Sequence, residues 1–217
     1  MNFMSNGPAT APLTVAFAHG AGAGMDSDFM AYFADALAQR GLRVARFEFP
    51  YMAERRASGR KRPPDRAPVL LEIWRAVTAH FGAANTIVAG KSMGARIGSL
   101  VASELEAAGT PVAGCVYLGY PFHAPGKPMG SRDIPLADAR TPTLLIQGER
   151  DPFGSRAEMD AYAFGPGVRL HLIADGDHSL VPRKSSGRTR EQNWNEAVAA
   201  IAAFVAALHP HASTSSA

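Results

Sequence analysis

The chain contains a serine between two glycines, in Gly90-Lys91-Ser92-Met93-Gly94, directly after the apolar run 86–89 and before a stretch of helical periodicity, 92–108. A serine in a sharp turn between a strand and a helix has its hydroxyl lifted out of the packing, and small flanking residues leave room for the neighbouring backbone. The pattern predicts that Ser92 is a nucleophile. Its chemistry would be acyl transfer, in which the Ser92 oxygen attacks a carbonyl carbon.

Such a nucleophile requires a base, and the base requires an acid that fixes its tautomer. His178 follows the apolar segment 169–173, and Asp151 follows the segment 143–147. Both side chains stand at the carboxyl ends of predicted strands, and in a parallel sheet these ends meet at one edge. We therefore expect His178 to be the base and Asp151 to be its acid.

Two other acids compete with Asp151 for this role. Asp175 and Asp177 precede His178 closely in the sequence. Their position in the same loop makes it difficult for either carboxylate to reach the far ring nitrogen of His178, so Asp151 is the stronger candidate. His19 is expected to brace the loop that contains it rather than to act as a base.

A nucleophile of this kind also needs N–H groups that stabilise the negative oxygen formed during the reaction. One donor would be the backbone N–H of Met93, directly after the nucleophile. The other would come from the loop after the first predicted strand, His19-Gly20-Ala21-Gly22-Ala23-Gly24. Its small residues let the backbone approach a substrate, and we favour Ala21 as the donor, with Gly22 second.

The same glycines permit other interpretations, which the spacing disfavours. One alternative is that Ser92 is only a helix N-cap, but the candidate acid and base that follow it in sequence favour a nucleophile. A phosphate-binding P-loop needs a glycine five residues before Gly90, where the chain has Asn85. A dinucleotide-binding fingerprint starting at Gly20 or Gly22 would need its third glycine at Met25 or Ser27.

Apolar segments of strand length alternate with helical segments through the chain, which predicts an α/β fold with a mostly parallel central sheet and helices on both faces. The predicted strands are 13–18, 42–49, 86–89, 112–118, 143–147 and 169–173. The predicted helices are 26–40, 67–81, 92–108 and 191–208. We expect a flexible N-terminus over 1–12, one domain over 13–208 and a disordered tail over 209–217.

Composition excludes several classes of protein. The net charge of +3 is too small to indicate nucleic-acid binding. No apolar run approaches the roughly 20 residues that span a bilayer, and the N-terminus lacks the features of a signal peptide, so a cytoplasmic protein without membrane contact is expected. The single cysteine, Cys115, is expected to be buried, and the seven scattered histidines give no metal-ligand spacing. We expect no metal and no organic cofactor.

Basic residues concentrate in two segments. Segment 54–66 has six basic and two acidic side chains, and segment 183–190 has four basic and no acidic side chains. Both follow predicted strands at the expected catalytic edge, so we hypothesise that they favour anionic esters or an acidic partner. Lys91, beside the nucleophile, and His123 are candidate substrate contacts. The sequence does not distinguish a monomer from a homodimer.

Several short motifs resemble those of α/β-hydrolases, in particular a small dienelactone-hydrolase-like group that includes a subunit of a eukaryotic chromatin acetyltransferase complex. The motifs are the 19–24 loop, Phe49-Pro50-Tyr51, 90–94, Leu118-Gly119-Tyr120-Pro121, Gln147-Gly148-Glu149-Arg150-Asp151-Pro152-Phe153-Gly154 and Gly176-Asp177-His178. The resemblance implies an α/β-hydrolase fold and a Ser-Asp-His triad but no substrate. A serine instead of the cysteine of dienelactone hydrolase argues against that enzyme's own reaction.

Together these features predict a serine hydrolase, a carboxylesterase or thioesterase acting on small substrates. The alternative is an interaction protein that has the fold without the activity. A third possibility is a lyase or transferase on the same fold.

Overall fold

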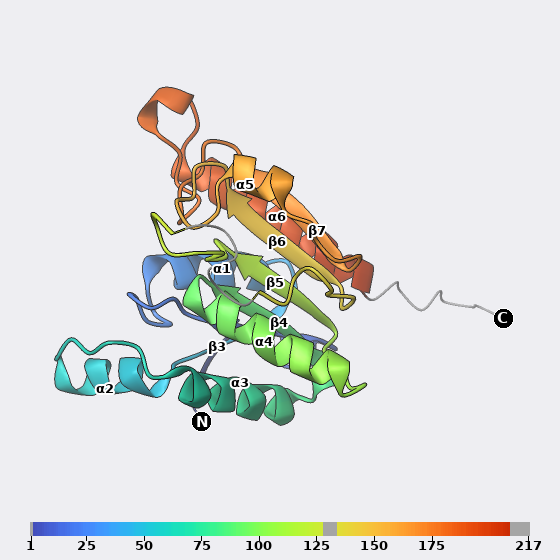
Figure 1. The fold of residues 1–217 in the computed structure, drawn as a ribbon. Coiled ribbons are helices and arrows are strands. Elements are labelled where there is room, and N and C mark those ends of the chain that lie inside the picture. The colour runs from blue at the N-terminus through green and yellow to red at the C-terminus, as the bar shows by residue number, and fades with distance from the viewer. Residues whose placement is uncertain (1, 128–133, 209–217) are drawn as a thin grey trace.

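The computed structural model describes residues 2–127 and 134–208, whose strands form one seven-stranded sheet (Figure 1). The strands are β1 (Phe3–Asn6), β2 (Thr14–Ala18), β3 (Arg43–Phe47), β4 (Thr86–Lys91), β5 (Gly114–Leu118), β6 (Thr143–Gly148) and β7 (Val168–Ile173). Their order in space is β1-β3-β2-β4-β5-β6-β7. Only β1 is antiparallel to its neighbour, so the predicted mostly parallel sheet is confirmed.

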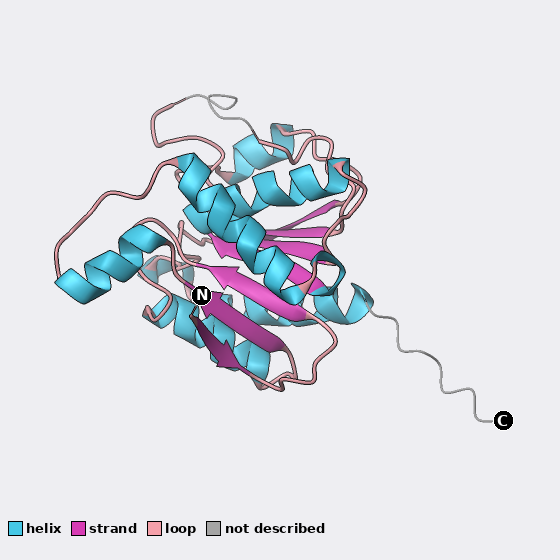
Figure 2. Ribbon diagram, turned by 90° about the horizontal axis from the view of Figure 1, so that it is seen from below, coloured by secondary structure: helices cyan, strands magenta, loops and turns pink. Residues whose placement is uncertain are grey.

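Helices cover both faces of the sheet (Figure 2). Side chains alternate along the buried strands, so that Val15 and Phe17 join one core and Ala16 and Ala18 join the other. Helices α1 (Asp28–Ala38) and α6 (Arg190–Leu208) pack on the first face. Helices α3 (Ala67–Phe81) and α4 (Met93–Ala107) pack on the second.

The structure contains elements that the sequence analysis missed. The N-terminal segment expected to be flexible contains β1, which pairs with β3. The basic segment 54–66 begins inside a helix, α2 (Pro50–Ser58), which has proline at its first position and ends at Gly59 with φ 69°. A short helix, α5 (Arg156–Ala161), follows β6, and 3₁₀ turns lie at η1 (Ala83–Asn85) and η2 (Lys184–Ser186). The predicted tail 209–217 lies outside the described residues.

The register of the sheet brings the carboxyl ends of the parallel strands to a common level. Ala18 of β2 pairs with Gly90 of β4, and Lys91 of β4 pairs with Leu118 of β5. The segments containing α2 and η2 project at this edge (Figure 1). The candidate catalytic residues therefore lie at the carboxyl ends of the parallel strands, on the same side of the sheet, as the sequence indicated.

Candidate active site

Ser92 occupies a strained turn between β4 and α4. Its φ of 53° and ψ of −117° are unusual for a residue with a side chain, as a nucleophile elbow requires. A Cβ at Gly90 would lie 2.3 Å from the Ala95 nitrogen, and a Cβ at Gly94 would lie 2.6 Å from the His19 oxygen. Only glycine fits at both positions, which explains their spacing around Ser92.

The structure brings the three predicted chemical residues into one hydrogen-bonded chain. The Ser92 hydroxyl oxygen lies 2.9 Å from Nε2 of His178, and Nδ1 of His178 lies 2.8 Å from Oδ2 of Asp151. Because a carboxylate accepts at Nδ1, that nitrogen bears the proton, and Nε2 is left to accept the serine proton. Asp151 is fully buried, whereas 23% of the His178 side chain is exposed at the sheet edge.

The Asp151 carboxylate is held by further donors. Nε2 of Gln147 lies 2.9 Å from Oδ2, and the backbone N–H of Phe153 donates to Oδ1 over 2.9 Å. The Phe153 ring also packs on His178, with ring centroids 4.4 Å apart. Sequence reasoning missed Gln147, although an amide at the end of the apolar strand 143–147 was a usable signal, because a buried amide needs partners.

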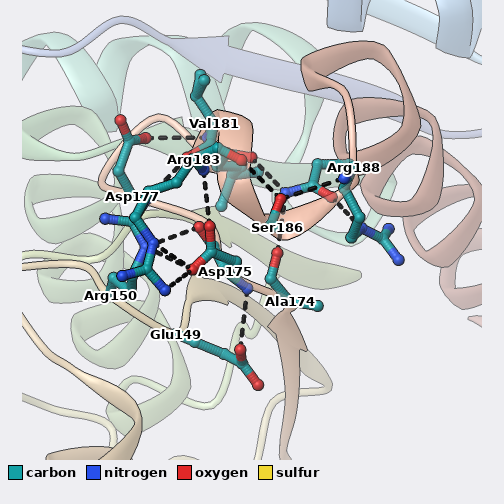
Figure 3. A network of polar contacts seen from close by, with 11 residues as sticks. Glu149, Arg150, Ala174, Asp175, Asp177, Val181, Arg183, Ser186 and Arg188 are labelled. Atoms are coloured by element: carbon teal, nitrogen blue, oxygen red, sulfur yellow. Dashed lines mark hydrogen bonds and ion pairs between the residues drawn. The ribbon is translucent and has the colours of Figure 1, made fainter.

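The two competing acids are engaged elsewhere in the loop that follows β7 (Figure 3). Asp175 pairs with Arg183 at 2.5 Å and with Arg150 at 3.0 Å, and hydrogen bonding to Arg183 lowers the pKa of Asp175. Oδ1 of Asp177 accepts the backbone N–H of Val181 at 2.9 Å. Both carboxylates therefore shape the loop that presents His178, and Asp151 is the acid in contact with its ring.

The loop expected to stabilise the oxyanion lies against Ser92. A Cβ at Gly20 would be 3.5 Å from the Ser92 Cβ. The Tyr51 hydroxyl lies 3.2 Å from the Gly20 carbonyl oxygen and 3.1 Å from that of Ala21. In a trans peptide the next N–H points opposite to the carbonyl, so the Ala21 and Gly22 N–H groups point away from Tyr51. Within the described parts of the chain, neither has a hydrogen-bond acceptor.

The second expected donor is in place at the start of α4. Met93 is the first residue of that helix, and the first N–H groups of a helix have no partner inside it. The positions of Ala21, Gly22 and Met93 agree with the predicted oxyanion site, whose function stays a prediction.

His19 braces this loop from beneath. Its Nε2 accepts the backbone N–H of Phe49 at 3.2 Å, so Nδ1 bears the proton and donates to the Gly20 carbonyl at 2.7 Å. Burial lowers the pKa of His19, which favours this neutral form. The arrangement agrees with a structural role for His19 rather than with a base.

Lys91 and His123, the two candidate substrate contacts, are both buried and both contact other parts of the protein. Lys91 is 8% exposed and donates to the His178 carbonyl at 2.6 Å. His123 is 4% exposed, with Nδ1 2.9 Å from the Ala124 oxygen and Nε2 2.9 Å from Oε1 of Glu158. Neither group is positioned as an open binding residue at the sheet edge.

Most arginines of the two basic segments form ion pairs with carboxylates of this chain. The pairs are Arg56 with Asp26 and Glu48, Arg62 with Glu54, Arg183 with Asp175, Arg188 with Glu196, and Arg190 with Glu191. Among the described residues, the basic side chains of these segments without a carboxylate partner are Arg55, Arg60, Lys61, Arg66 and Lys184. Arg55 donates to the Gly22 carbonyl at 3.1 Å and lines a cavity of about 310 Å³ with the 22–24 backbone and with the ion-paired Arg56, Asp26 and Glu48.

No group of three or more His, Cys, Asp and Glu side chains is arranged to hold a metal ion within 2–127 and 134–208. In the same residues no helix has the length and hydropathy needed to cross a bilayer.

Comparison with known proteins identifies relatives by sequence family and by fold. Residues 11–206 match the family model described as alpha/beta hydrolase domain. No curated protein matches the chain.

Solved structures share the fold at low sequence identity. An alpha-beta serine hydrolase homologue from Coxiella burnetii is 22% identical, with a TM-score of 0.63 over 92% of this chain and 90% of that one. Est1E from Butyrivibrio proteoclasticus, solved with ferulic acid, is 14% identical, with a TM-score of 0.68 over 95% and 94%. The RedJ thioesterase from Streptomyces coelicolor is 15% identical, with a TM-score of 0.62 over 90% and 91%.

Proposed function

Because the chain belongs to the alpha/beta hydrolase domain family, we propose that it is a serine hydrolase that cleaves ester or thioester bonds of small substrates. The observation that carries the proposal is the hydrogen-bonded chain from Asp151 through His178 to Ser92, with distances of 2.8 and 2.9 Å. The buried carboxylate, the partly exposed imidazole and the strained serine each have the environment that their proposed role requires.

In the proposed mechanism, Nε2 of His178 removes the Ser92 proton as Oγ attacks the substrate carbonyl. The negative oxygen is held by the N–H groups of Met93 and Ala21, with Gly22 as the second candidate in the loop. His178 then gives its proton to the leaving alcohol or thiol. A water molecule, deprotonated by His178, attacks the acyl carbon and breaks its bond to Ser92 Oγ, which takes the proton back from His178. Asp151 stabilises the imidazolium in both steps.

Esters and thioesters are proposed together because this mechanism places no demand on the leaving atom. Structural neighbours include proteins described as an esterase domain and as a thioesterase, which supports either substrate. A panel of p-nitrophenyl esters and acyl-CoA thioesters of graded length would identify the preferred bond. Membership of the dienelactone-hydrolase-like subgroup stays a prediction from the motifs.

A fluorophosphonate probe tests the proposed nucleophile directly. We expect a covalent adduct on Ser92 by mass spectrometry, no adduct in Ser92→Ala and a slower reaction in His178→Ala. Ser103→Ala, at an exposed position of α4, is the matched control and should label normally. Absence of labelling in well-folded protein would favour the alternative, an interaction protein with the hydrolase fold.

We further propose that the substrate has an anionic group recognised by Arg55. The support is its unpaired charge within the described residues, its bond to the Gly22 carbonyl and the cavity that it shares with the candidate oxyanion loop. A guanidinium offers a fixed fork of donors suited to a carboxylate or phosphate. Among the basic side chains without a carboxylate partner, Arg55 is the one in contact with the candidate oxyanion loop, so we assign the predicted preference for anionic esters to it.

Matched esters test this preference. Mono-p-nitrophenyl glutarate and p-nitrophenyl valerate have the same chain length but differ in charge. We expect Arg55→Met to lower kcat/KM for the glutarate by about 10-fold and to change that for the valerate by less than about 2-fold. Arg60→Met, on the same projecting segment, is the control. Equal effects on both esters would contradict the proposal.

A further inference from the structure

The ammonium group of Lys91 lies under the loop that presents His178. Lys91 is the last residue of β4 and directly precedes Ser92 in the chain. Its Nζ donates to the His178 carbonyl oxygen over 2.6 Å and lies 5.6 Å from the centre of the Phe29 ring. The residue beside the candidate nucleophile therefore binds the backbone of the candidate base.

Gly119, directly after β5, leaves room for this contact. It adopts a φ of 57°, a conformation that favours glycine. A Cβ at this position would lie 2.5 Å from the His178 carbonyl oxygen and 2.8 Å from Nζ of Lys91. The absence of a side chain at Gly119 leaves the space in which the ammonium and the carbonyl meet.

Burying an ammonium group in this place carries a cost. Burial lowers the pKa of Lys91 to about 8, although the nearby carboxylates of Asp151 and Asp177 act in the opposite direction. A methionine would fill a similar space without that cost, because it has no charge to desolvate. The charge is therefore poorly explained by packing, whereas a charge-assisted hydrogen bond to His178 accounts for it.

We infer that Lys91 is a positioning residue, which holds the backbone of His178 so that the imidazole stays within reach of the Ser92 hydroxyl. The inference rests on the proposed function, since the position of His178 matters for catalysis only if His178 is the base. Lys91 and Ser92 are adjacent in the chain. The base is thus tied to the nucleophile by two short connections, one through its ring and one through its carbonyl.

The test uses Lys91→Met, with Lys184→Met as the matched control, since Lys184 is exposed in η2 of the same long loop. We expect Lys91→Met to lower kcat by about 10- to 100-fold with KM changed by less than about 2-fold, because small misplacement of a catalytic group has effects of this size. Hydrogen exchange of residues 174–182 should become faster in Lys91→Met only.

The pH profile separates positioning from a general structural role. The charged and titratable groups that face Lys91 are Asp151, Asp177 and His178. The carboxylates of Asp151 and Asp177 favour the charged form of Lys91. Deprotonation of Lys91 above about pH 8 weakens its bond to the carbonyl, so kcat of the wild-type protein should fall there. Lys91→Met should lack this alkaline fall. If Lys91→Met only lowered the amount of folded protein, kcat would be reduced by the same factor at every pH and the decrease above pH 8 would remain.

The possible results distinguish this inference from the proposed function. If hydrolysis depends on Ser92 but Lys91→Met keeps its kcat and its loop protection, the role of Lys91 is overturned and the hydrolase stands. If the wild-type protein shows no Ser92-dependent labelling or hydrolysis, the proposed function fails, and loop protection still decides whether Lys91 holds His178. Should Lys91→Met not fold, Lys91→Gln, which keeps an N–H donor, is expected to show partial kcat without the alkaline fall.

Discussion

Gln147 is bonded at both ends of its side chain inside the protein. Its Oε1 accepts the backbone N–H of Tyr120 at 2.8 Å, and its Nε2 lies 2.9 Å from Asp151 Oδ2 and 3.1 Å from the Gly154 oxygen. One fully buried amide therefore joins β6 to the segment after β5 and to the acid of the site. The geometry of Asp151 depends on this residue as well as on its own position.

Replacing Gln147 with methionine should damage both activity and stability. The variant removes a donor from Asp151 and leaves buried polar groups without this partner, at a cost of about 1–3 kcal/mol each. We expect kcat/KM to fall by about 10-fold and the free energy of unfolding in urea to fall by at least about 1 kcal/mol. Gln39→Met, at an exposed position, should change neither. An active, equally stable Gln147→Met would contradict this assignment.

Lys91 should also make stability depend on pH. Its pKa is about 8 in the folded protein against an ordinary value of 10.5, so between these values the unfolded chain binds more protons. Stability of the wild-type protein relative to Lys91→Met should therefore rise from pH 8 to pH 10.5, by up to about 3 kcal/mol. Urea unfolding of both proteins at pH 7 and pH 10 measures the difference, and a difference that does not vary with pH would contradict the expectation.

At the scale of elements, α4 approaches the end of β2 so closely that Gly94 has no room for a side chain. A Cβ there would lie 2.6 Å from the His19 oxygen and 2.7 Å from the Ala18 oxygen. The start of α4, which includes Met93, is therefore in close contact with the end of β2, the strand that leads into the candidate oxyanion loop. The distance between the two expected N–H donors is therefore set by helix packing.

Gly94→Ala should separate these elements. We expect a loss of about 1–3 kcal/mol in the free energy of unfolding from the added methyl group, and a fall in kcat larger than the rise in KM, because the oxyanion donors move apart. Ser103→Ala serves as the control, because it removes only a hydroxyl group at an exposed position of the same helix. Unchanged unfolding in Gly94→Ala would show that the contact is looser than described.

The sequence indicated the parallel strands and the long helices because their apolar residues recur with a clear period. It missed β1, in which none of the four residues is buried, and α2, in which only Tyr51 and Met52 are buried. It also predicted that Ser92, Asp151 and His178 lie close together, because each follows an apolar segment that can be recognised in the sequence. The partners of Lys91 and Gln147 could not be predicted, because they depend on how β4, β6 and their loops meet in space.

For the whole molecule, the arginines of the basic segments contribute less free positive charge than the local clusters in the sequence suggest. Arg183, Arg188 and Arg190 each pair with a carboxylate of the loop after β7 or of α6. Arg56 pairs with two acids near the oxyanion loop. The arginines of these pairs are 34 to 62% exposed, so the pairs add little stability, but they cancel the field that unpaired arginines would create.

The remaining field should appear in the salt dependence of turnover. Charges separated by more than about 10 Å are screened at 0.1 M salt, whereas a direct contact is screened less. From 20 to 500 mM NaCl, we expect kcat/KM for an anionic ester to fall by about 3-fold and that for a neutral ester of equal length to stay constant. Equal behaviour of the two esters would rule out electrostatic guidance of the substrate.

The place of each candidate catalytic residue in the sheet has a consequence for how the protein would be inactivated. Ser92 follows β4, which has strands on both sides, whereas His178 follows β7, the edge strand at one side of the sheet. Outer elements open at lower free energy than interior ones. Transient release of β7 would remove the base while most of the sheet stays folded. Hydrolytic activity should then be lost in mild denaturant before the circular dichroism signal changes. The rate of inactivation would depend on the opening of β7.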